Sequence, residues 1–352
     1  MRRLLVGLSV VPLVTLATPS LAQTESRTVK GSTVAIYNLA GRMRAVAGTG
    51  DAVVVDVTRG GHDGAQLKIA TGTIRGRETL RIIYPSDRIV YPDMRNRSSN
   101  MNVREDGTFS EGSWDDDGGR DRVEIRSYGP GLEAFADLTV KIPPGQKIQL
   151  FLGVGRMEVA NVEGSIFVDV GAADVDVGGV KGNLGLDTGS GRIAVRDVTG
   201  DLDIDTGSGG LTIDRVTGSS LRLDSGSGGV EGSDITVNEF RVDIGSGGLR
   251  MSRVKAQNLD VDTGSGGASL ELLSVFEKLV IDTGSGGVTV RAPAALSADV
   301  DVETGSGGFQ SDFEITTRRV SRNHVEGRIG DGKASIRIEA GSGTVRLVKG
   351  TS

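Results

Sequence analysis

The chain has 352 residues, no cysteine, and a formal net charge of −6 from 40 basic and 46 acidic side chains. The lack of cysteine excludes disulfides, thiolate metal sites and thiol nucleophiles, and the slight acidic excess argues against nucleic acid or an anionic membrane as a partner. Glycine accounts for 54 residues and aromatic residues for only 4%, which indicates many tight turns around a thin aliphatic core.

The first 22 residues are typical of a secretory signal peptide. Arg2 and Arg3 precede an apolar stretch from Leu4 to Leu16, and Ser20-Leu21-Ala22 places small residues at the positions that signal peptidase recognises. The apolar stretch is shorter than the roughly 20 residues that a membrane-spanning helix needs. We therefore expect cleavage after Ala22 and an exported protein, located in the periplasm, at the cell surface or outside the cell. No second apolar run of spanning length follows, so we expect no transmembrane segment in the mature chain.

Residues 23–137 predict a less regular β cap with a long polar loop. Short apolar runs typical of strands lie at 34–36, 53–57, 67–69, 80–82 and 123–125. The stretch from Tyr84 to Asp121 is rich in Pro, Asn, Ser, Asp and Gly, which favours a long loop. The repeats that follow need such a cap, because an open end of stacked strands would expose core and strand edges.

One acidic segment within this stretch resembles a calcium-binding loop. With Ser113 as position 1, the EF-hand positions 3, 5, 6, 9 and 12 are filled by Asp115, Asp117, Gly118, Asp121 and Glu124. Ser113 replaces the usual Asp, Arg120 replaces the usual apolar residue, and neither flank has a helical pattern. An ordinary acidic loop is therefore the favoured interpretation, and calcium binding is the alternative. We expect no other cofactor.

From residue 138 onwards the sequence repeats with a period of 18–21 residues. Gly-Ser-Gly begins at Gly189, Gly207, Gly226, Gly245, Gly264, Gly284, Gly305 and Gly341, after degenerate copies at Gly153 and Gly171. The copy expected near Asn323 is missing. Apolar residues stand five and three positions before the first glycine of each copy, as Leu202 and Ile204 do. This alternation predicts a strand, a glycine turn and a second strand in every repeat.

A unit this short cannot bury its apolar face alone, so we expect residues 138–352 to stack as the coils of a parallel β-solenoid. In-register stacking places equivalent side chains above one another. Two positions before the glycine, nine of the ten copies carry an acidic residue: Asp169, Asp187, Asp205, Asp224, Asp243, Asp262, Asp282, Glu303 and Glu339. These residues predict an acidic column on the outside, which is either a solvated face or a surface that collects cations or cationic partners.

Three segments resemble one known family. They are Leu138-Thr-Val-Lys-Ile-Pro-Pro-Gly-Gln-Lys-Ile148, the Asp-Thr-Gly-Ser-Gly-Gly copies, and Gly330-Asp-Gly-Lys-Ala-Ser-Ile-Arg-Ile-Glu-Ala-Gly-Ser-Gly-Thr-Val-Arg-Leu347. Together they resemble the bacterial β-strand-repeat family of proposed adhesins, which is a domain of unknown function. The resemblance implies an exported β-solenoid with an adhesive or surface role.

No motif for catalysis stands apart from the repeat. Asp-Thr-Gly-Ser is the active-site tetrapeptide of aspartic proteases, but such enzymes bring two carboxylates together from two lobes, whereas the four copies here follow the repeat spacing. His62 and His324 are the only histidines and lie far apart in the sequence, which disfavours a histidine-based triad or metal site. We therefore expect no catalytic and no cofactor-binding residues.

The sequence favours a non-enzymatic envelope or surface protein, a proposed adhesin that uses its solenoid faces to bind an unidentified surface component, either protein or polysaccharide. The alternative is a carbohydrate-active enzyme on a parallel β-helix. The constant coil length and the single tryptophan, Trp114, argue against that alternative. Ice binding through hydroxyl ladders ranks last, because the Ser and Thr ladders are expected at turns.

Overall fold

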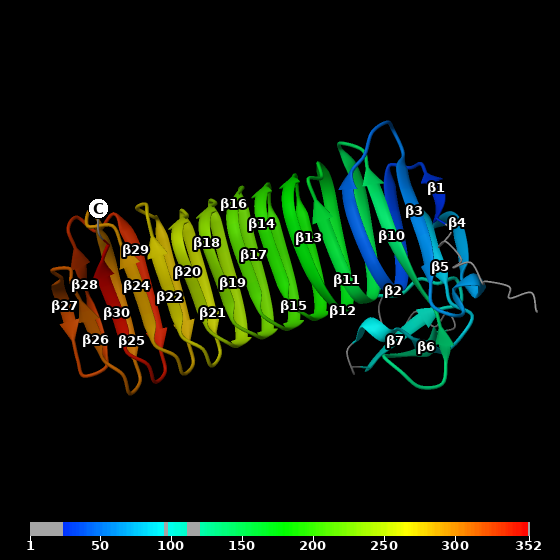
Figure 1. Ribbon diagram of the computed structural model, residues 1–352. Helices are drawn as coiled ribbons and strands as arrows, with labels where there is room; N and C mark the ends of the chain where they lie inside the picture. Colours follow the sequence, from blue (N-terminus) through cyan, green and yellow to red (C-terminus); the bar gives the residue numbers. More distant parts are fainter. Residues whose placement is uncertain (1–23, 95–97, 111–119, 351–352) are drawn as a thin grey trace, which may run out of the picture.

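The protein is a rod of stacked β coils with a wider N-terminal end (Figure 1). Its computed structural model describes residues 24–94, 98–110 and 120–350. These residues form 30 strands and two short 3-10 helices, without an α-helix. The predicted all-β class is therefore confirmed. No helix within the described ranges is long and apolar enough to cross a membrane.

Each regular coil contains two strands joined by short turns. The first strands are β13 (Leu184–Ser190), β15 (Leu202–Ser208), β17 (Ser220–Ser227), β19 (Glu239–Ser246), β21 (Asn258–Thr263), β23 (Lys278–Thr283), β25 (Ala298–Thr304) and β29 (Ala334–Ala340). The second strands are β14 (Ile193–Thr199), β16 (Leu211–Thr217), β18 (Val230–Thr236), β20 (Leu249–Lys255), β22 (Ala268–Leu272), β24 (Val288–Ala292), β26 (Phe309–Ser311) and β30 (Val345–Lys349). We call the outer sides of these two sets the first-strand face and the second-strand face.

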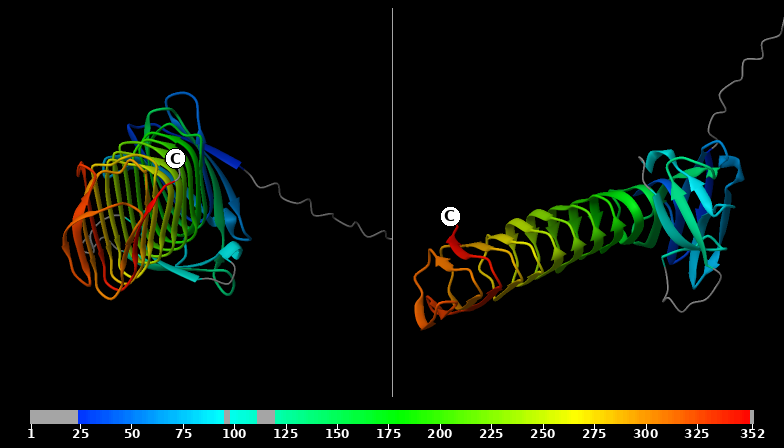
Figure 2. Two further views of the ribbon diagram at one scale, coloured as in Figure 1. Left: turned by 90° about the vertical axis from the view of Figure 1, so that its left-hand side faces the viewer. Right: turned by 90° about the horizontal axis from the view of Figure 1, so that it is seen from below.

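Successive coils pair in parallel and in register, which confirms the predicted β-solenoid. In the first strands, Ile204 lies opposite Leu186 on one side and Leu223 on the other. In the second strands, Leu211 lies opposite Val230. The inward Leu, Ile and Val side chains are buried between the two sheets, and the stack seen along its axis is a flattened tube (Figure 2). Each coil thus covers the apolar side chains of the next.

The stack begins earlier in the chain than the repeats do. The long strands β11 (Gln146–Ala160) and β12 (Gly164–Lys181) each run through a whole coil, and β2 (Thr33–Ala47) pairs with β11 in the same parallel register, from Thr33 opposite Lys147 onwards. A segment of the predicted cap therefore supplies one further coil. The division at residues 137 and 138 remains a proposal about where the sequence repeats start.

Further strands flank this first coil, two of them parallel to its strand and the others antiparallel to their neighbours. They are β1 (Thr24–Val29), β3 (Val53–Gly60) and β10 (Phe135–Ile142), with the hairpin of β4 (Lys68–Ile74) and β5 (Arg77–Ile83) after the 3-10 helix η1 (Gly64–Gln66). β3 pairs with both β1 and β10, and β5 pairs with β2. The strands predicted at 34–36, 53–57, 67–69, 80–82 and 123–125 are all present.

The prediction of a long loop from Tyr84 to Asp121 is wrong for most of the residues described there. A separate four-stranded sheet contains β6 (Arg88–Val90), β7 (Ser98–Arg104), β8 (Arg120–Arg126) and β9 (Leu132–Glu133), with the 3-10 helix η2 (Pro92–Met94) beside it. β7 and β8 pair antiparallel and bury Val103, Val123 and Ile125. The outward residues of β7 are polar, so its few apolar residues gave a weak strand pattern.

The C-terminal coil does not stack in sequence order. β29 pairs with β23 on one side and with β25 on the other, so the last coil lies between the two coils that precede it in the chain (Figure 1). The copy expected near Asn323 is replaced by a hairpin of β27 (Thr316–Val320) and β28 (His324–Ile329), and β28 pairs antiparallel with β25. The hairpin covers the edge of the terminal coil, where an open strand would invite pairing with other chains.

Candidate functional site

The predicted acidic column lies on the first-strand face. Its carboxylates stand opposite one another in adjacent strands, about 4.8 Å apart, in the spatial order Asp169, Asp187, Asp205, Asp224, Asp243, Asp262, Asp282, Glu339 and Glu303. They point outward because the alternating Leu, Ile and Val residues of the same strands point into the core. Asp169 is buried, and most of the others are exposed.

Aromatic residues replace the acidic column at its N-terminal end. Tyr37 and Phe151 occupy the same position in the first two coils, and their rings stack with centroids 4.3 Å apart. Phe109, which follows β7, packs edge-on against both rings. The four-stranded sheet therefore covers this end of the first-strand face, and the exposed carboxylates begin with Asp187.

Among the described residues, the carboxylates in the middle of the acidic column form no ion pair, although the nearby Arg222 lowers the pKa of Asp224 slightly against the other effects. At the C-terminal end Glu339 forms an ion pair with Arg337, but no ion pair within the described residues reaches the six carboxylates from Asp187 to Asp282. Partial burial raises the pKa of Asp187, Asp224 and Asp262, and the neighbouring carboxylates of the column raise it further. The face therefore carries repulsion that a bound cation would relieve.

The raised pKa values predict how single changes in the column act on stability. A carboxyl whose folded-state pKa exceeds its unfolded value binds protons more tightly when folded, so its contribution to stability rises as the pH falls from above the folded pKa towards about 3.9. We expect Asp224→Asn and Asp262→Asn, each made singly, to raise the free energy of unfolding at pH 7 by less than about 1 kcal/mol, because both carboxyls are largely exposed. The melting temperature should rise slightly with it. The gain should vanish near pH 3 in thermal melts.

A matched control should shift the other way. Hydrogen bonding to Arg253 lowers the pKa of Asp234, so its stabilising contribution is present at neutral pH and lost as the pH falls through the folded pKa. We expect Asp234→Asn to lower the melting temperature at pH 7. Equal shifts for both variants would contradict the electrostatic interpretation of the column.

The second-strand face contains a column that the sequence analysis missed. Asn161, Asp197, Arg215, Asp234 and Arg253 have φ values of 54–57°, and Gly179 occupies the equivalent place with φ 72°. Because of the left-handed residue, two consecutive side chains point outward, and the residues on either side of them are buried. The second strands therefore do not alternate strictly with period two. One feature of the sequence could have revealed this column. Apolar residues of the second strands are spaced three apart at this point, as Ile213 and Val216 are, with a charged residue between them.

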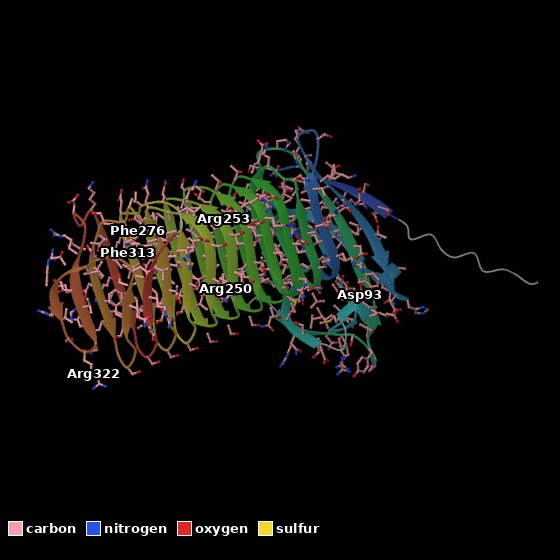
Figure 3. The ribbon with its side chains drawn as sticks, turned by 60° about the vertical axis from the view of Figure 1, so that its left-hand side comes forward. Asp93, Arg250, Arg253, Phe276, Phe313 and Arg322 are labelled. Atoms are coloured by element: carbon pink, nitrogen blue, oxygen red, sulfur yellow. The ribbon has the colours of Figure 1, made fainter. Side chains whose placement is uncertain are left out.

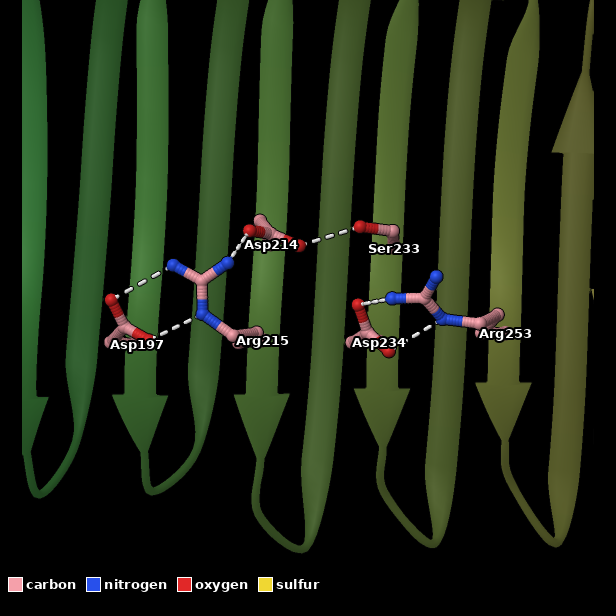
Figure 4. A network of polar contacts seen from close by, with 6 residues as sticks. All are labelled: Asp197, Asp214, Arg215, Ser233, Asp234 and Arg253. Carbon is pink, nitrogen blue, oxygen red and sulfur yellow. Dashed lines mark hydrogen bonds and ion pairs between the residues drawn. The ribbon is translucent and has the colours of Figure 1, made fainter.

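The charged residues of this left-handed column pair with one another (Figure 4). Arg215 donates from Nε to Asp197 Oδ1 at 2.6 Å and from Nη2 to Oδ2 at 3.0 Å, and it also contacts Asp214. Arg253 binds Asp234 in the same two-pronged way, with 2.7 Å from Nε to Oδ1. Arginine lowers the pKa of both Asp197 and Asp234. This is the opposite of the raised pKa that the general acid of a glycosidase needs.

The left-handed column borders a groove with a volume of about 940 Å³. Its other wall includes Lys181, Thr199, Thr217 and Thr236, which lie opposite one another in successive strands. The three threonines are exposed near the ends of second strands. Each of the three is the last residue of its strand, directly beside a turn, and the left-handed residue two positions before it restores its outward direction.

The left-handed column ends at Arg253. The register between β20 and β22 shifts between Met251 and Val254, and later second strands lack the bulge. Figure 3 shows Arg250 and Arg253 in the middle of the rod, with Phe276 and Phe313 further towards the C-terminal end. Both phenylalanines are buried. The groove is thus confined to the middle and N-terminal coils.

The calcium hypothesis falls mainly outside the described residues. Asp115 and Asp117 are not described, and Asp121 and Glu124 lie in β8, where Glu124 forms an ion pair with Arg126. Within the described ranges no three His, Cys, Asp or Glu side chains are grouped closely enough to hold a metal ion. Calcium binding by this loop remains a prediction.

The remaining sequence motifs occupy structural positions. In each Asp-Thr-Gly-Ser copy the aspartate points outward at the end of a first strand, and the threonine, such as Thr206, is buried. His324 contacts Asp301 Oδ1 at 2.7 Å from Nε2, in the hairpin end of the rod, whereas His62 lies in the N-terminal cap. Neither histidine therefore lies beside the middle of the acidic column or beside the groove.

Parallel coils with glycine turns and regular exposed columns define a β-solenoid of the repeat class. The chain belongs to the Toastrack DUF4097 family, whose model matches residues 128–348. This membership confirms the family resemblance predicted from the sequence. No curated protein is significantly similar to the chain.

Three solved structures are similar to this chain over almost its whole length. A proposed cell adhesion protein from Clostridium sporogenes is 13% identical, covers 93% of this chain and 99% of its own, and has a TM-score of 0.21. A proposed lipid-binding protein from Parabacteroides distasonis is 14% identical over 92% and 96%, with a TM-score of 0.39. A proposed adhesin from Bacteroides fragilis is 9% identical over 93% and 97%, with a TM-score of 0.30.

Proposed function

We propose that the protein is an exported, non-enzymatic envelope or surface protein with an adhesive role, and that it binds through its acidic first-strand face. The observation that supports this most directly is the set of six in-register carboxylates from Asp187 to Asp282 without an ion pair among the described residues. On the second-strand face, by contrast, Asp197 and Asp234 are neutralised by arginines. Because these six carboxylates have no ion pair among the described residues, the column fits a surface component, protein or polysaccharide, that presents positive charge.

Repetition favours binding over catalysis. A catalytic site places a few unlike groups around one reacting atom, whereas this face offers the same carboxylate on coil after coil. Identical weak contacts along a rod add up through avidity, because each later contact forms at a high effective concentration. Such a surface suits attachment to another extended or repetitive surface.

The test is graded neutralisation of the acidic column. We expect Asp205→Asn alone to change binding to a cell-envelope fraction or a polylysine-coated surface by less than about threefold, since one exposed charge contributes little. Asn at Asp205, Asp224, Asp243 and Asp262 together should weaken binding more than tenfold, and high salt should have the same effect on the wild type. Surface plasmon resonance with the exported protein measures the affinity of each variant. The N-terminus of that protein should be Gln23.

A control on the other face separates local from net charge. Neutralising Glu158, Asp176, Glu231 and Glu271 changes the net charge by the same amount on the second-strand side and should leave binding within threefold. If the two quadruple variants behave alike, the acidic column is not the binding face. If one substitution abolishes a turnover measured on peptides or polysaccharides, the protein is an enzyme and the proposal fails.

A further inference from the structure

The left-handed column on the second-strand face keeps side chains where glycine would fit better. A positive φ is disfavoured for residues with a Cβ and costs nothing comparable for glycine. Gly179 occupies this position in one coil, yet Asn161, Asp197, Arg215 and Asp234 occupy it in others with φ near 55°. Backbone strain that recurs in successive coils points to a role for the side chains themselves.

The groove beside this column is electrically balanced. Its acidic lining residues are Glu163, Asp197 and Asp234, and its basic ones are Lys181, Arg215 and Arg253. The two-pronged pairs hold each guanidinium flat against a carboxylate. A balanced groove gives no net attraction to a charged polymer, in contrast to the acidic first-strand face.

The groove is nevertheless rich in hydrogen-bonding groups. A guanidinium has five N–H donors and a carboxylate about four acceptor positions, so each paired group retains capacity beyond its own ion pair. The hydroxyls of Thr199, Thr217 and Thr236 both donate and accept, and all three are exposed. Mixed donors and acceptors without net charge match the hydroxyl groups of a sugar, which also donate and accept.

The shape fits an extended chain that lies across the strands. From Asn161 to Arg253 the column crosses six successive coils, about 24 Å at the spacing of neighbouring strands. The groove lies on a sheet face and not at a sheet edge, so a peptide cannot bind there by adding a strand.

We propose that the groove between the left-handed column and the threonines Thr199, Thr217 and Thr236 binds an uncharged polysaccharide chain along the rod axis. This site is separate from the acidic first-strand face. The paired arginines and aspartates fix the orientation of the sugar hydroxyls, and the threonine ladder repeats the same contact at each coil. The interaction is binding without bond cleavage.

The first test removes the hydroxyls and leaves the ion pairs. Affinity electrophoresis of the full mature protein would use gels containing dextran, a β-glucan or a galactomannan, with polygalacturonate and chitosan as the anionic and cationic comparisons. We expect retardation by at least one uncharged polymer, weakened at least tenfold when Thr199, Thr217 and Thr236 are all changed to Val. Changing Thr212, Thr289 and Thr316 to Val, outside the groove, should leave retardation unchanged.

The second test separates binding from a structural role. Arg215→Gly and Arg253→Gly together relieve the left-handed strain but also remove the ion pairs with Asp197 and Asp234. The two effects oppose each other, so we expect a melting temperature close to that of the wild type with at least fivefold weaker retardation by the same polymer. A purely structural column would change the melting temperature and leave retardation alone. The acidic-column quadruple variant should bind the polysaccharide as the wild type does, which keeps this result independent of the proposed function.

Two results would overturn the inference. One is the absence of retardation by every uncharged polymer, including the case in which only a charged polymer binds. The other is a groove variant with three valines that remains folded and is retarded as strongly as the wild type.

Discussion

Gly209→Ala is expected to destabilise the solenoid by more than about 3 kcal/mol, among the largest effects that a single methyl group can have here. A Cβ at this position would lie 1.8 Å from the carbonyl oxygen of Gly191 in the preceding coil. The backbone φ of +134° also lies in a region that L residues rarely adopt. The coils pair on both sides, so neither backbone can move away without breaking its own hydrogen bonds.

The adjacent glycine is the matched control. A Cβ at Gly210 would meet no atom within 4 Å, so Gly210→Ala should change the free energy of unfolding by less than about 0.5 kcal/mol, or raise it slightly through lower entropy of the unfolded chain. Urea titrations followed by circular dichroism measure both variants. Similar midpoints would show that close backbone approach is not what selects glycine at Gly209.

This contrast shows what the sequence could and could not reveal about the glycines. Their period predicted the coils, and turns were the natural explanation for them. The structure adds a second reason, because Gly191, Gly209 and Gly228 lie one above another with each potential Cβ directed at the carbonyl of the coil before. Sequence alone does not distinguish that column from Gly210, since both are glycines of one Gly-Ser-Gly-Gly segment.

The first strands were predictable from alternation, and the second strands only in part. Leu202 and Ile204 alternate with Asp203 and Asp205, so their inward and outward directions follow from period two. In the second strands a left-handed residue such as Arg215 changes the direction of the residues after it. The positive φ does not require one residue type at this position, since Asn, Asp, Arg and Gly all occupy it. The sequence analysis missed the groove for that reason.

The position of the last coil could not be predicted because the repeats are too alike. Ile336 lies between Leu279 and Val300, and any of these aliphatic residues would pack equally well against the others. The preferences of these side chains for one another therefore do not determine the order in which the coils stack. The 36-residue gap before Gly341 showed that a copy was missing, and the hairpin of β27 and β28 now explains how the chain returns to insert its final coil.

Ile204→Asp is expected to have the second large effect, a loss of several kcal/mol or failure to fold. Ile204 is fully buried and packs in register between Leu186 and Leu223, so a carboxylate there would lose its hydration without gaining a cation. Ile204→Val keeps the shape apart from one methyl group and should cost about 0.5–1.5 kcal/mol. Asp203→Asn, on the exposed side of the same strand, should stay within about 0.5 kcal/mol.

The form of the Ile204→Asp transition carries additional information. Each coil contacts only its neighbours, so stability is close to a sum of coil and interface terms. A charge in the middle of the stack should therefore uncouple the two halves, and melts should broaden or split into two steps instead of shifting as one. Hydrogen exchange should then show early loss of protection in β15 and the coils beside it. If Ile204→Asp and Asp203→Asn melt alike, the assignment of inward and outward residues in the first strands is wrong.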